Sequence, residues 1–213
     1  GVGGGVSRDP RRSAVIAGAL AAIEEEGPDV GLASIARRAG LQRPNVYRVF
    51  PSKDDLDREV ALTAAIQLAD VVRPHLTDSG TMTQIARSVI ASGMEWAAEH
   101  PHLYRFVAAH QQESGRASFL AEMVEAVRAY VRASGMAIEV SDGALAPLMA
   151  MVDVGIVWWL DHGDEPKEAV TDRLARHVAL CLRDIAAELG LEIPGDMVFA
   201  PAALARAGSA PAG

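Results

Sequence analysis

Cysteine is nearly absent from this 213-residue sequence, which contains only Cys181. A single thiol excludes an intramolecular disulfide, so nothing indicates an oxidising compartment, and we expect a cytoplasmic location. Aromatic residues make up 5% of the chain, and β-branched runs of alternating polarity are missing. Because Ala, Leu and Val dominate the hydrophobic half of the composition, we predict an all-α fold.

Uninterrupted apolar runs are missing as well. The Gly-rich N-terminus has no apolar core of signal-peptide length. The longest apolar run, residues 144–160, is interrupted by Pro147, Asp153 and Gly155. We therefore expect a soluble protein with no membrane partner.

Acidic residues outnumber basic ones, and the net charge is −8, but the excess is unevenly distributed. Residues 1–60 hold nine basic and nine acidic side chains, and the remaining residues hold eleven and nineteen. Residues 34–53 carry five positive charges and no carboxylate: Arg37, Arg38, Arg43, Arg48 and Lys53. This local patch is compatible with a nucleic-acid partner despite the acidic total.

Three helices are predicted near the N-terminus, over residues 11–26, 32–39 and 44–50. A Gly-Pro pair ends the first, and Gly40 ends the second, where a left-handed residue is needed. Pro44 is tolerated in the first turn of the third helix because its missing N–H would be unpaired there. The short second and third helices with this tight turn predict a helix-turn-helix.

The third helix is predicted to bury one apolar stripe and to leave polar side chains for the major groove. The stripe consists of Val46, Val49 and Phe50. The free positions are Gln42, Arg43, Asn45 and Arg48. Arg can bridge guanine O6 and N7, and Asn can bridge adenine N6 and N7, so this face suits direct base readout.

Longer amphipathic helices are predicted over residues 54–76, 81–99, 102–112, 116–134, 143–161 and 167–189. The chain is accordingly divided into a disordered arm, a helix-turn-helix domain, a larger helical domain and a flexible tail. Their predicted ranges are 1–10, 11–53, 54–192 and 193–213.

The stretch LASIARRAGLQRPNVYRVFPSKDDL, residues 32–56, resembles the signature of the tetracycline-repressor (TetR) family. The matched positions are Ile35, Ala36, Ala39, Gly40, Tyr47, Phe50, Ser52, Lys53 and Leu56. The resemblance implies a three-helix DNA-binding domain followed by a larger helical domain for ligand binding and dimerisation. It also implies a repressor that a small apolar or amphipathic molecule releases from a palindromic operator.

The resemblance implies that Tyr47 and Lys53 bind phosphates and that Gln42 and Arg43 approach bases. Val49 stands where the family often has a His or Tyr that contacts the DNA backbone, and Arg48 beside it is expected to take over that contact. The predicted DNA-contact set is Arg37, Gln42, Arg43, Asn45, Tyr47, Arg48 and Lys53. Upstream, Arg8, Arg11 and Arg12 either reach the DNA as an arm or lie in solvent.

Aromatic and Met side chains at helical spacing more often belong to a core than to a ligand site, but here they are concentrated in the segments that line the ligand cavity in this family. The predicted ligand-binding set is Trp96, Tyr104, Phe119, Met123, Asp153 and Trp158. A carboxylate in an apolar helix needs a partner, so Asp153 lies in a pocket, at a dimer contact or at a solvent edge.

Competing functions have less support in the sequence. No G-x-S-x-G, H-E-x-x-H or P-loop motif is present, so an enzyme is disfavoured. A helical adaptor that binds only protein stays an alternative. His100 and His102 straddle Pro101 with poor spacing for metal ligands, so no metal or cofactor is expected. The expected partners are double-stranded operator DNA, a small-molecule effector and a second copy of the chain.

Overall fold

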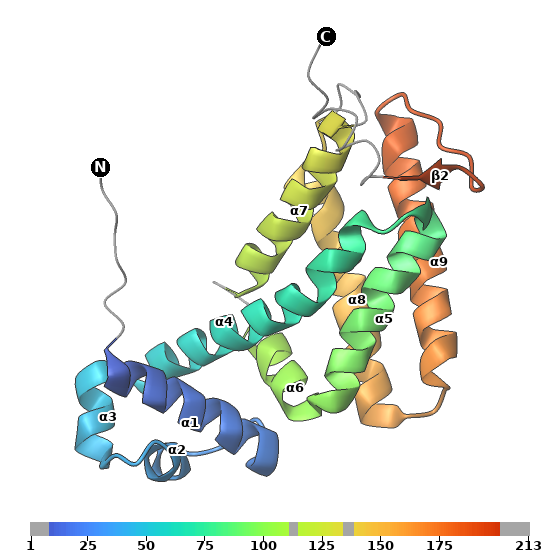
Figure 1. Ribbon diagram of the computed structural model, residues 1–213. Coiled ribbons are helices and arrows are strands. Elements are labelled where there is room, and N and C mark those ends of the chain that lie inside the picture. Colours follow the sequence, from blue (N-terminus) through green and yellow to red (C-terminus); the bar gives the residue numbers. More distant parts are fainter. Residues whose placement is uncertain (1–8, 111–114, 134–138, 201–213) are drawn as a thin grey trace, which may run out of the picture. The chain divides into compact units, whose positions relative to one another are not determined.

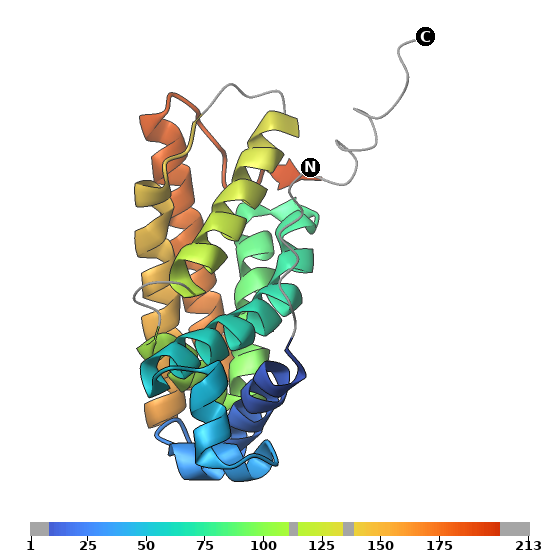
Figure 2. The same cartoon turned by 90° about the vertical axis from the view of Figure 1, so that its left-hand side faces the viewer.

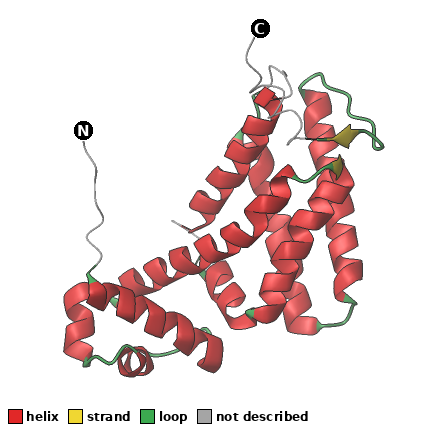
Figure 3. Cartoon of the chain, in the orientation of Figure 1, coloured by secondary structure: helices red, strands yellow, loops and turns green. Residues whose placement is uncertain are grey.

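The computed structural model describes residues 9–110, 115–133 and 139–200. This part of the chain contains nine α-helices, one 3-10 helix and two strands of two residues each (Figure 3). The predicted all-α class is therefore confirmed.

The chain divides into two compact units. The first comprises residues 1–65 and 100–115, and the second comprises residues 66–99 and 116–213. Sequence reasoning placed a boundary near residue 53, at the end of the helix-turn-helix. The first compact unit includes the beginning of α4 (Lys53–Val72) and also α6 (Pro101–Ala109), which packs on α1 (Pro10–Glu26).

The first unit begins with α1 (Pro10–Glu26), and both ends of this helix have a physical cause. The Asp9 side chain caps the start by accepting a hydrogen bond from the Arg11 N–H at 2.9 Å. Gly27, with φ of 103°, ends the helix while its N–H donates to Ile23 O.

The turn between α2 (Leu32–Arg38) and α3 (Arg43–Val49) is fixed by its backbone. Gly40 has φ of 68°. The N–H of Gly40 donates to Arg37 O, and that of Leu41 donates to Ala36 O. This pattern satisfies the last carbonyls of α2 and reverses the chain, as the sequence predicted from the glycine.

The core of the first unit comes from every helix of that unit. α4 (Lys53–Val72) enters it with its first turns, and α6 (Pro101–Ala109) covers α1. The largest fully buried side chains of this unit are Val15, Ile23, Ile35, Val46, Phe50, Leu56, Val60 and Phe106. The apolar stripe of the helix-turn-helix is thus buried as predicted, except that Val49 is only half-buried.

The second unit is built on α5 (Met82–Glu99), α8 (Asp142–His162) and α9 (Lys167–Glu188), which pack against one another (Figures 1 and 2). α7 (Gly115–Ala133) joins them through Val124, which packs with Leu145 of α8.

Two segments of the second unit differ from the sequence prediction. The helix expected to reach residue 76 ends as α4 at Val72 and continues as a 3-10 helix, Arg73–Thr77, since Pro74 supplies no N–H for the α-helical pattern. Further on, β1 (Gly80–Thr81) pairs antiparallel with β2 (Val198–Phe199). β2 lies in the predicted flexible tail, where Phe199 is buried and only 6% exposed.

α8 is unusually apolar for a helix whose surface is mostly not buried. Its most apolar window has a mean hydropathy of 1.7, and 11% of that window is buried within the chain. By length and composition this helix qualifies as a candidate membrane span, and one such helix is weak support for membrane insertion. Val154 and Trp158, one turn apart, are 65% and 57% exposed.

Candidate nucleic-acid interface

α3 presents a polar face opposite its buried side. Val46 is 1% exposed and Phe50, at the C-terminal cap, is equally buried. Gln42, the N-cap residue of α3, is exposed and makes no side-chain cap hydrogen bond. The other exposed polar side chains of α3 are Arg43, Tyr47 and Arg48, and Asn45 is half-buried. This arrangement leaves the residues expected to read bases accessible.

The five cations of residues 34–53 are not equivalent. Arg38 and Lys53 form close ion pairs within the chain, and Arg37 forms a wide one at 4.0 Å. Among the described residues, Arg43 and Arg48 have no ion pair or side-chain hydrogen bond. Most of the uncompensated positive charge therefore lies on α3.

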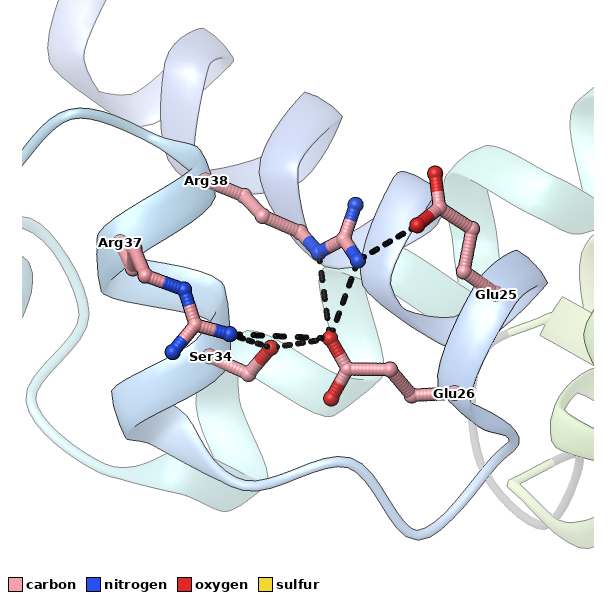
Figure 4. Close-up of polar contacts among 5 residues, drawn as sticks. All are labelled: Glu25, Glu26, Ser34, Arg37 and Arg38. Atoms are coloured by element: carbon pink, nitrogen blue, oxygen red, sulfur yellow. Dashed lines mark hydrogen bonds and ion pairs between the residues drawn. The ribbon is translucent and has the colours of Figure 1, made fainter.

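Figure 4 shows the cluster that occupies Arg37 and Arg38, where the end of α1 meets α2. The Arg38 guanidinium donates to Glu25 at 2.7 Å and to Glu26 at 3.0 Å. The Ser34 hydroxyl also donates to Glu26. We call these five side chains the α1–α2 charge cluster; it joins the first helix of the helix-turn-helix to α1.

Hydrogen bonds within the charge cluster shift the pKa values of Glu25, Glu26 and Arg38. The hydrogen bond from Arg38 lowers the pKa of the Glu25 carboxyl below its ordinary value of 4.5. At Glu26, the hydrogen bond from Ser34 and then that from Arg38 lower the pKa in the same direction. Hydrogen bonds to the two carboxylates raise the pKa of Arg38. Glu25, Glu26 and Arg38 are therefore charged at neutral pH.

Lys53 lies at the first position of α4, where the helix start is capped by Ser52. The Ser52 Oγ accepts from the Asp55 N–H at 3.1 Å and donates to the Asp55 carboxylate at 2.8 Å. Lys53 Nζ pairs with Asp57 one turn later at 2.7 Å. A cation at a helix N-terminus is well placed for a DNA phosphate, which would have to compete with Asp57.

The histidines near α6 take part in local contacts. The His100 Nδ1 lies 3.0 Å from the Glu24 carboxylate. His110 ends α6, stacks on Phe106 and has its Nε2 3.8 Å from Asp57. Among the described residues, no group of three or more His, Cys, Asp or Glu is arranged to hold a metal ion.

The predicted ligand-binding residues are distributed over both units. Tyr104, 3% exposed, lies on α6 in the first unit, and Trp96, 6% exposed, lies on α5 in the second. Met123 and Asp153 are half-buried on α7 and α8. Trp158 is exposed and stacks on His162 with 3.8 Å between ring centroids. The side chain of Phe119 lies outside the described part of the structure, so this set stays a prediction.

Sequence reasoning missed the acidic partners of the basic patch. The Lys53–Asp57 pair has the spacing of one helical turn and could have been found from that spacing. The pairing of Arg38 with Glu25 and Glu26 spans 12 to 13 residues and depends on how α1 crosses α2. No pattern within one helix indicates such a contact.

Comparison with known families gives a match at the N-terminus. Residues 15–60 match the family model described as "Bacterial regulatory proteins, tetR family". The matched segment runs from within α1 through α2 and α3 into α4 and includes the exposed face of α3.

Individual relatives are more distant. An uncharacterized HTH-type transcriptional regulator of Mycobacterium tuberculosis is 27% identical over 106 residues, which is 49% of this chain and 45% of the relative. The chain thus matches about half the length of this curated relative.

Two solved structures show the likeness of the fold. A tetR-family transcriptional regulator from Streptomyces coelicolor has a TM-score of 0.63 at 20% identity, with 93% of this chain and 87% of that one covered. The regulator FadR from Bacillus subtilis, solved in complex with stearoyl-CoA, has a TM-score of 0.60 at 13% identity, with 78% and 97% covered.

Proposed function

We propose that this chain is a DNA-binding transcriptional regulator, because residues 15–60 match the tetR family of bacterial regulatory proteins. One observation carries the proposal. Within the matched segment, α3 exposes Arg43, Tyr47 and Arg48 while its opposite side is buried in the first unit. The two arginines lack an ion-pair partner in the described chain and are therefore available for phosphates and base edges.

The proposal includes repression that is relieved by a small apolar or amphipathic molecule bound in the second unit. A helical unit of this size exceeds what a helix-turn-helix needs for its own stability. The FadR structure with stearoyl-CoA supports an amphipathic effector by analogy of fold. The aromatic residues of α5 and α8 are the first candidates for contact with it.

The proposal also includes a homodimer formed through α8 and α9. Val154 and Trp158 on α8, and Leu180 on α9, are each more than half exposed. Apolar helix surface of this extent is stabilised when a second copy covers it. A second copy would also supply a second α3, as a palindromic operator requires.

We also propose that the protein is soluble and cytoplasmic and has no catalytic activity. A regulator of bacterial transcription must reach the chromosome, so the apolar face of α8 is assigned to a protein partner rather than to a lipid bilayer. Asp153 in the middle of that helix is unfavourable in a lipid-facing segment.

Selection of bound fragments from genomic DNA, followed by footprinting, tests the proposal. We expect a palindromic site whose half-sites lie about one helical turn, ~34 Å, apart. Arg43→Ala should relax the preference at one base pair of each half-site by ~1–3 kcal/mol. The exposed Arg132→Ala in α7 serves as the control. If the purified protein binds no DNA even at low salt, regulation is ruled out and the protein adaptor is favoured.

A further inference from the structure

Arg12 on α1 makes three contacts, two with the end of α3 and one with α4. Its Nη1 donates to the backbone carbonyl of Val49 at 2.8 Å. Its Nη2 forms an ion pair with Glu59 of α4. Its guanidinium carbon lies 4.3 Å from the centroid of the Phe50 ring. We call Arg12, Val49, Phe50 and Glu59 the Arg12 clamp.

The carbonyl that Arg12 binds has no partner in a regular helix. Val49 is the last residue of α3, and the last four carbonyls of any helix lack an intrahelical donor. α3 has only seven residues, so fewer than two turns separate this end from Arg43, whose side chain is exposed. A contact that fixes the end of so short a helix therefore also fixes the direction of its polar face.

The shape of the Arg12 side chain suits this role. A planar guanidinium can donate to two acceptors in fixed directions and lie over an aromatic ring at the same time, which an ammonium group cannot do. The Phe50 ring beneath it is 1% exposed and belongs to the core. Arg12, Phe50 and Glu59 line an open pocket of about 430 Å³ in the first unit, where Arg58 is already paired with Asp55.

The ion pair by itself contributes little, because the side chains of Arg12 and Glu59 are 35% and 40% exposed. The three contacts together join α1 to the end of α3 and to α4, and this gives Arg12 its geometric role. This differs from the two roles considered from the sequence, an arm that reaches the DNA and a solvated terminus.

We propose that Arg12 is a positioning residue for DNA recognition, which holds the end of α3 against α1 and α4 so that the exposed face of α3 keeps its orientation. The inference rests on the proposed function in one respect, that α3 reads DNA. The clamp itself can be tested without DNA.

The first test is backbone hydrogen exchange of the full-length protein. Arg12→Met keeps an unbranched side chain and removes the hydrogen bond, the ion pair and the cation–π contact. We expect the amides of residues 46–50 to exchange about tenfold faster, with α2 unchanged, because local opening of α3 becomes easier. Arg11→Met, which removes the same charge from an exposed neighbour, is the matched control. Unchanged exchange at residues 46–50 would overturn the clamp.

The second test is the affinity for a selected operator across a range of salt concentrations. We expect Arg12→Met to raise the Kd about tenfold relative to the wild-type protein, which corresponds to ~1.4 kcal/mol, with the salt slope of the wild-type protein. A phosphate contact would instead lower the magnitude of the slope by ~0.9. A slope reduced by that amount, or an unchanged Kd, would overturn positioning.

Two further variants keep the tests decisive. Glu59→Gln removes only the acidic partner and should give part of the effect in both measurements if the clamp acts as a unit. Arg12→Lys retains the charge but loses the planar fork, and we expect it to restore less than half of the loss in log Kd. If Arg12→Lys restores the full DNA affinity, the positive charge alone explains the effect and the clamp is overturned. If the wild-type protein binds no DNA, the proposed function fails while hydrogen exchange still decides the clamp.

Discussion

Lys53 forms an ion pair within the chain and is also a proposed contact for a DNA phosphate. In the structure its Nζ pairs with Asp57 at 2.7 Å, so a DNA phosphate must displace this carboxylate. We expect Lys53→Ala to weaken binding to all DNA sequences about tenfold and to lower the magnitude of the salt slope by ~0.9. Titration of operator and unrelated DNA at several salt concentrations measures both quantities.

Two variants bracket this expectation. Asp57→Asn should strengthen DNA binding, because it leaves Lys53 without its intramolecular competitor. Lys167→Ala removes another ion-paired lysine, bound to Glu95 in the second unit, and should change neither quantity. If Lys53→Ala and Lys167→Ala behave alike, Lys53 is not a phosphate contact.

The α1–α2 charge cluster predicts a pH dependence of stability. The pKa values of Glu25 and Glu26 are lowered in the folded chain, so their contribution is present above the ordinary pKa of 4.5. It is lost as the pH falls through the lowered folded values. Glu26→Gln should therefore destabilise the protein at pH 7 and reduce its further loss of stability below pH 4.5.

Urea unfolding at a series of pH values, followed by hydrogen exchange of α1 and α2, measures this effect. Glu188→Gln, at the exposed end of α9, is the control for loss of one carboxylate. Parallel pH profiles of wild-type and Glu26→Gln proteins would mean that the cluster contributes nothing to folding.

Residue roles could be predicted from the sequence where neighbours within one helix define them. The exposure of Arg43 and Arg48 follows from the apolar stripe that α3 buries. The role of Arg12 could not be predicted, because its partners lie 37 and 47 residues away and only the packed first unit brings them together.

At the scale of elements, the crossing of α1 and α2 depends on Gly18. A Cβ at this position would lie 3.0 Å from the Ala39 backbone nitrogen and 3.1 Å from the Ile35 carbonyl oxygen. Backbone atoms cannot rotate away, so we expect Gly18→Val to destabilise the first unit by ~1–3 kcal/mol. Denaturant unfolding monitored by circular dichroism, with exchange of α2 amides, measures the loss.

Gly143→Val is the matched control, since that helical glycine is exposed and its Cβ would meet only the Ser141 hydroxyl at 4.0 Å. It should change stability by a few tenths of a kcal/mol, as exposed substitutions usually do. Equal losses for the two variants would show that helix propensity, and not close packing at Gly18, sets the effect.

Helix boundaries were predictable from the sequence where a glycine ends the helix. Gly27, Gly40 and Gly163 all have positive φ at or just beyond the ends of their helices. The pairing of β1 with β2 was not, because two-residue strands have no period to detect and their partners are more than a hundred residues apart. Phe199, which is 6% exposed, lies in the segment that was predicted to be a flexible tail.

At the scale of the whole molecule, the exposed face of α8 predicts self-association. Val154→Asp places a charge on a residue that is 65% exposed in the single chain, so the isolated chain should tolerate it. We expect it to convert a dimer into a monomer at micromolar concentration, because an unpaired charge in an apolar interface is strongly unfavourable. Sedimentation velocity measures the mass.

Ile66→Asp on α4, 48% exposed, is the control and should remain dimeric. A wild-type protein that is monomeric at micromolar concentration would contradict the proposed α8–α9 interface. The same result would also mean that no second α3 is available to bind the second half-site of a palindromic operator.

The effector site is the feature that sequence and fold constrain least. A cavity depends on how several helices diverge, and aromatic side chains at helical spacing occur equally in a tight core. Trp96 illustrates this, since it is 6% exposed within α5 and buried among its neighbours. Which of the predicted residues contact an effector is therefore a question for ligand titration.

The three tryptophans allow that titration, because all belong to the second unit while the DNA-contact face belongs to the first. Trp96 is buried, Trp158 is exposed, and the Trp159 Nε1 donates to Glu165 O at 3.1 Å. We expect a long-chain acyl-CoA, used as the amphipathic probe, to change their fluorescence on binding. A ligand that lowers DNA affinity must bind more weakly when operator is present, by the same factor, typically ~5–150-fold. Titration with operator, with unrelated DNA and without DNA measures that factor; equal probe affinity in all three would exclude this class of molecule as the effector.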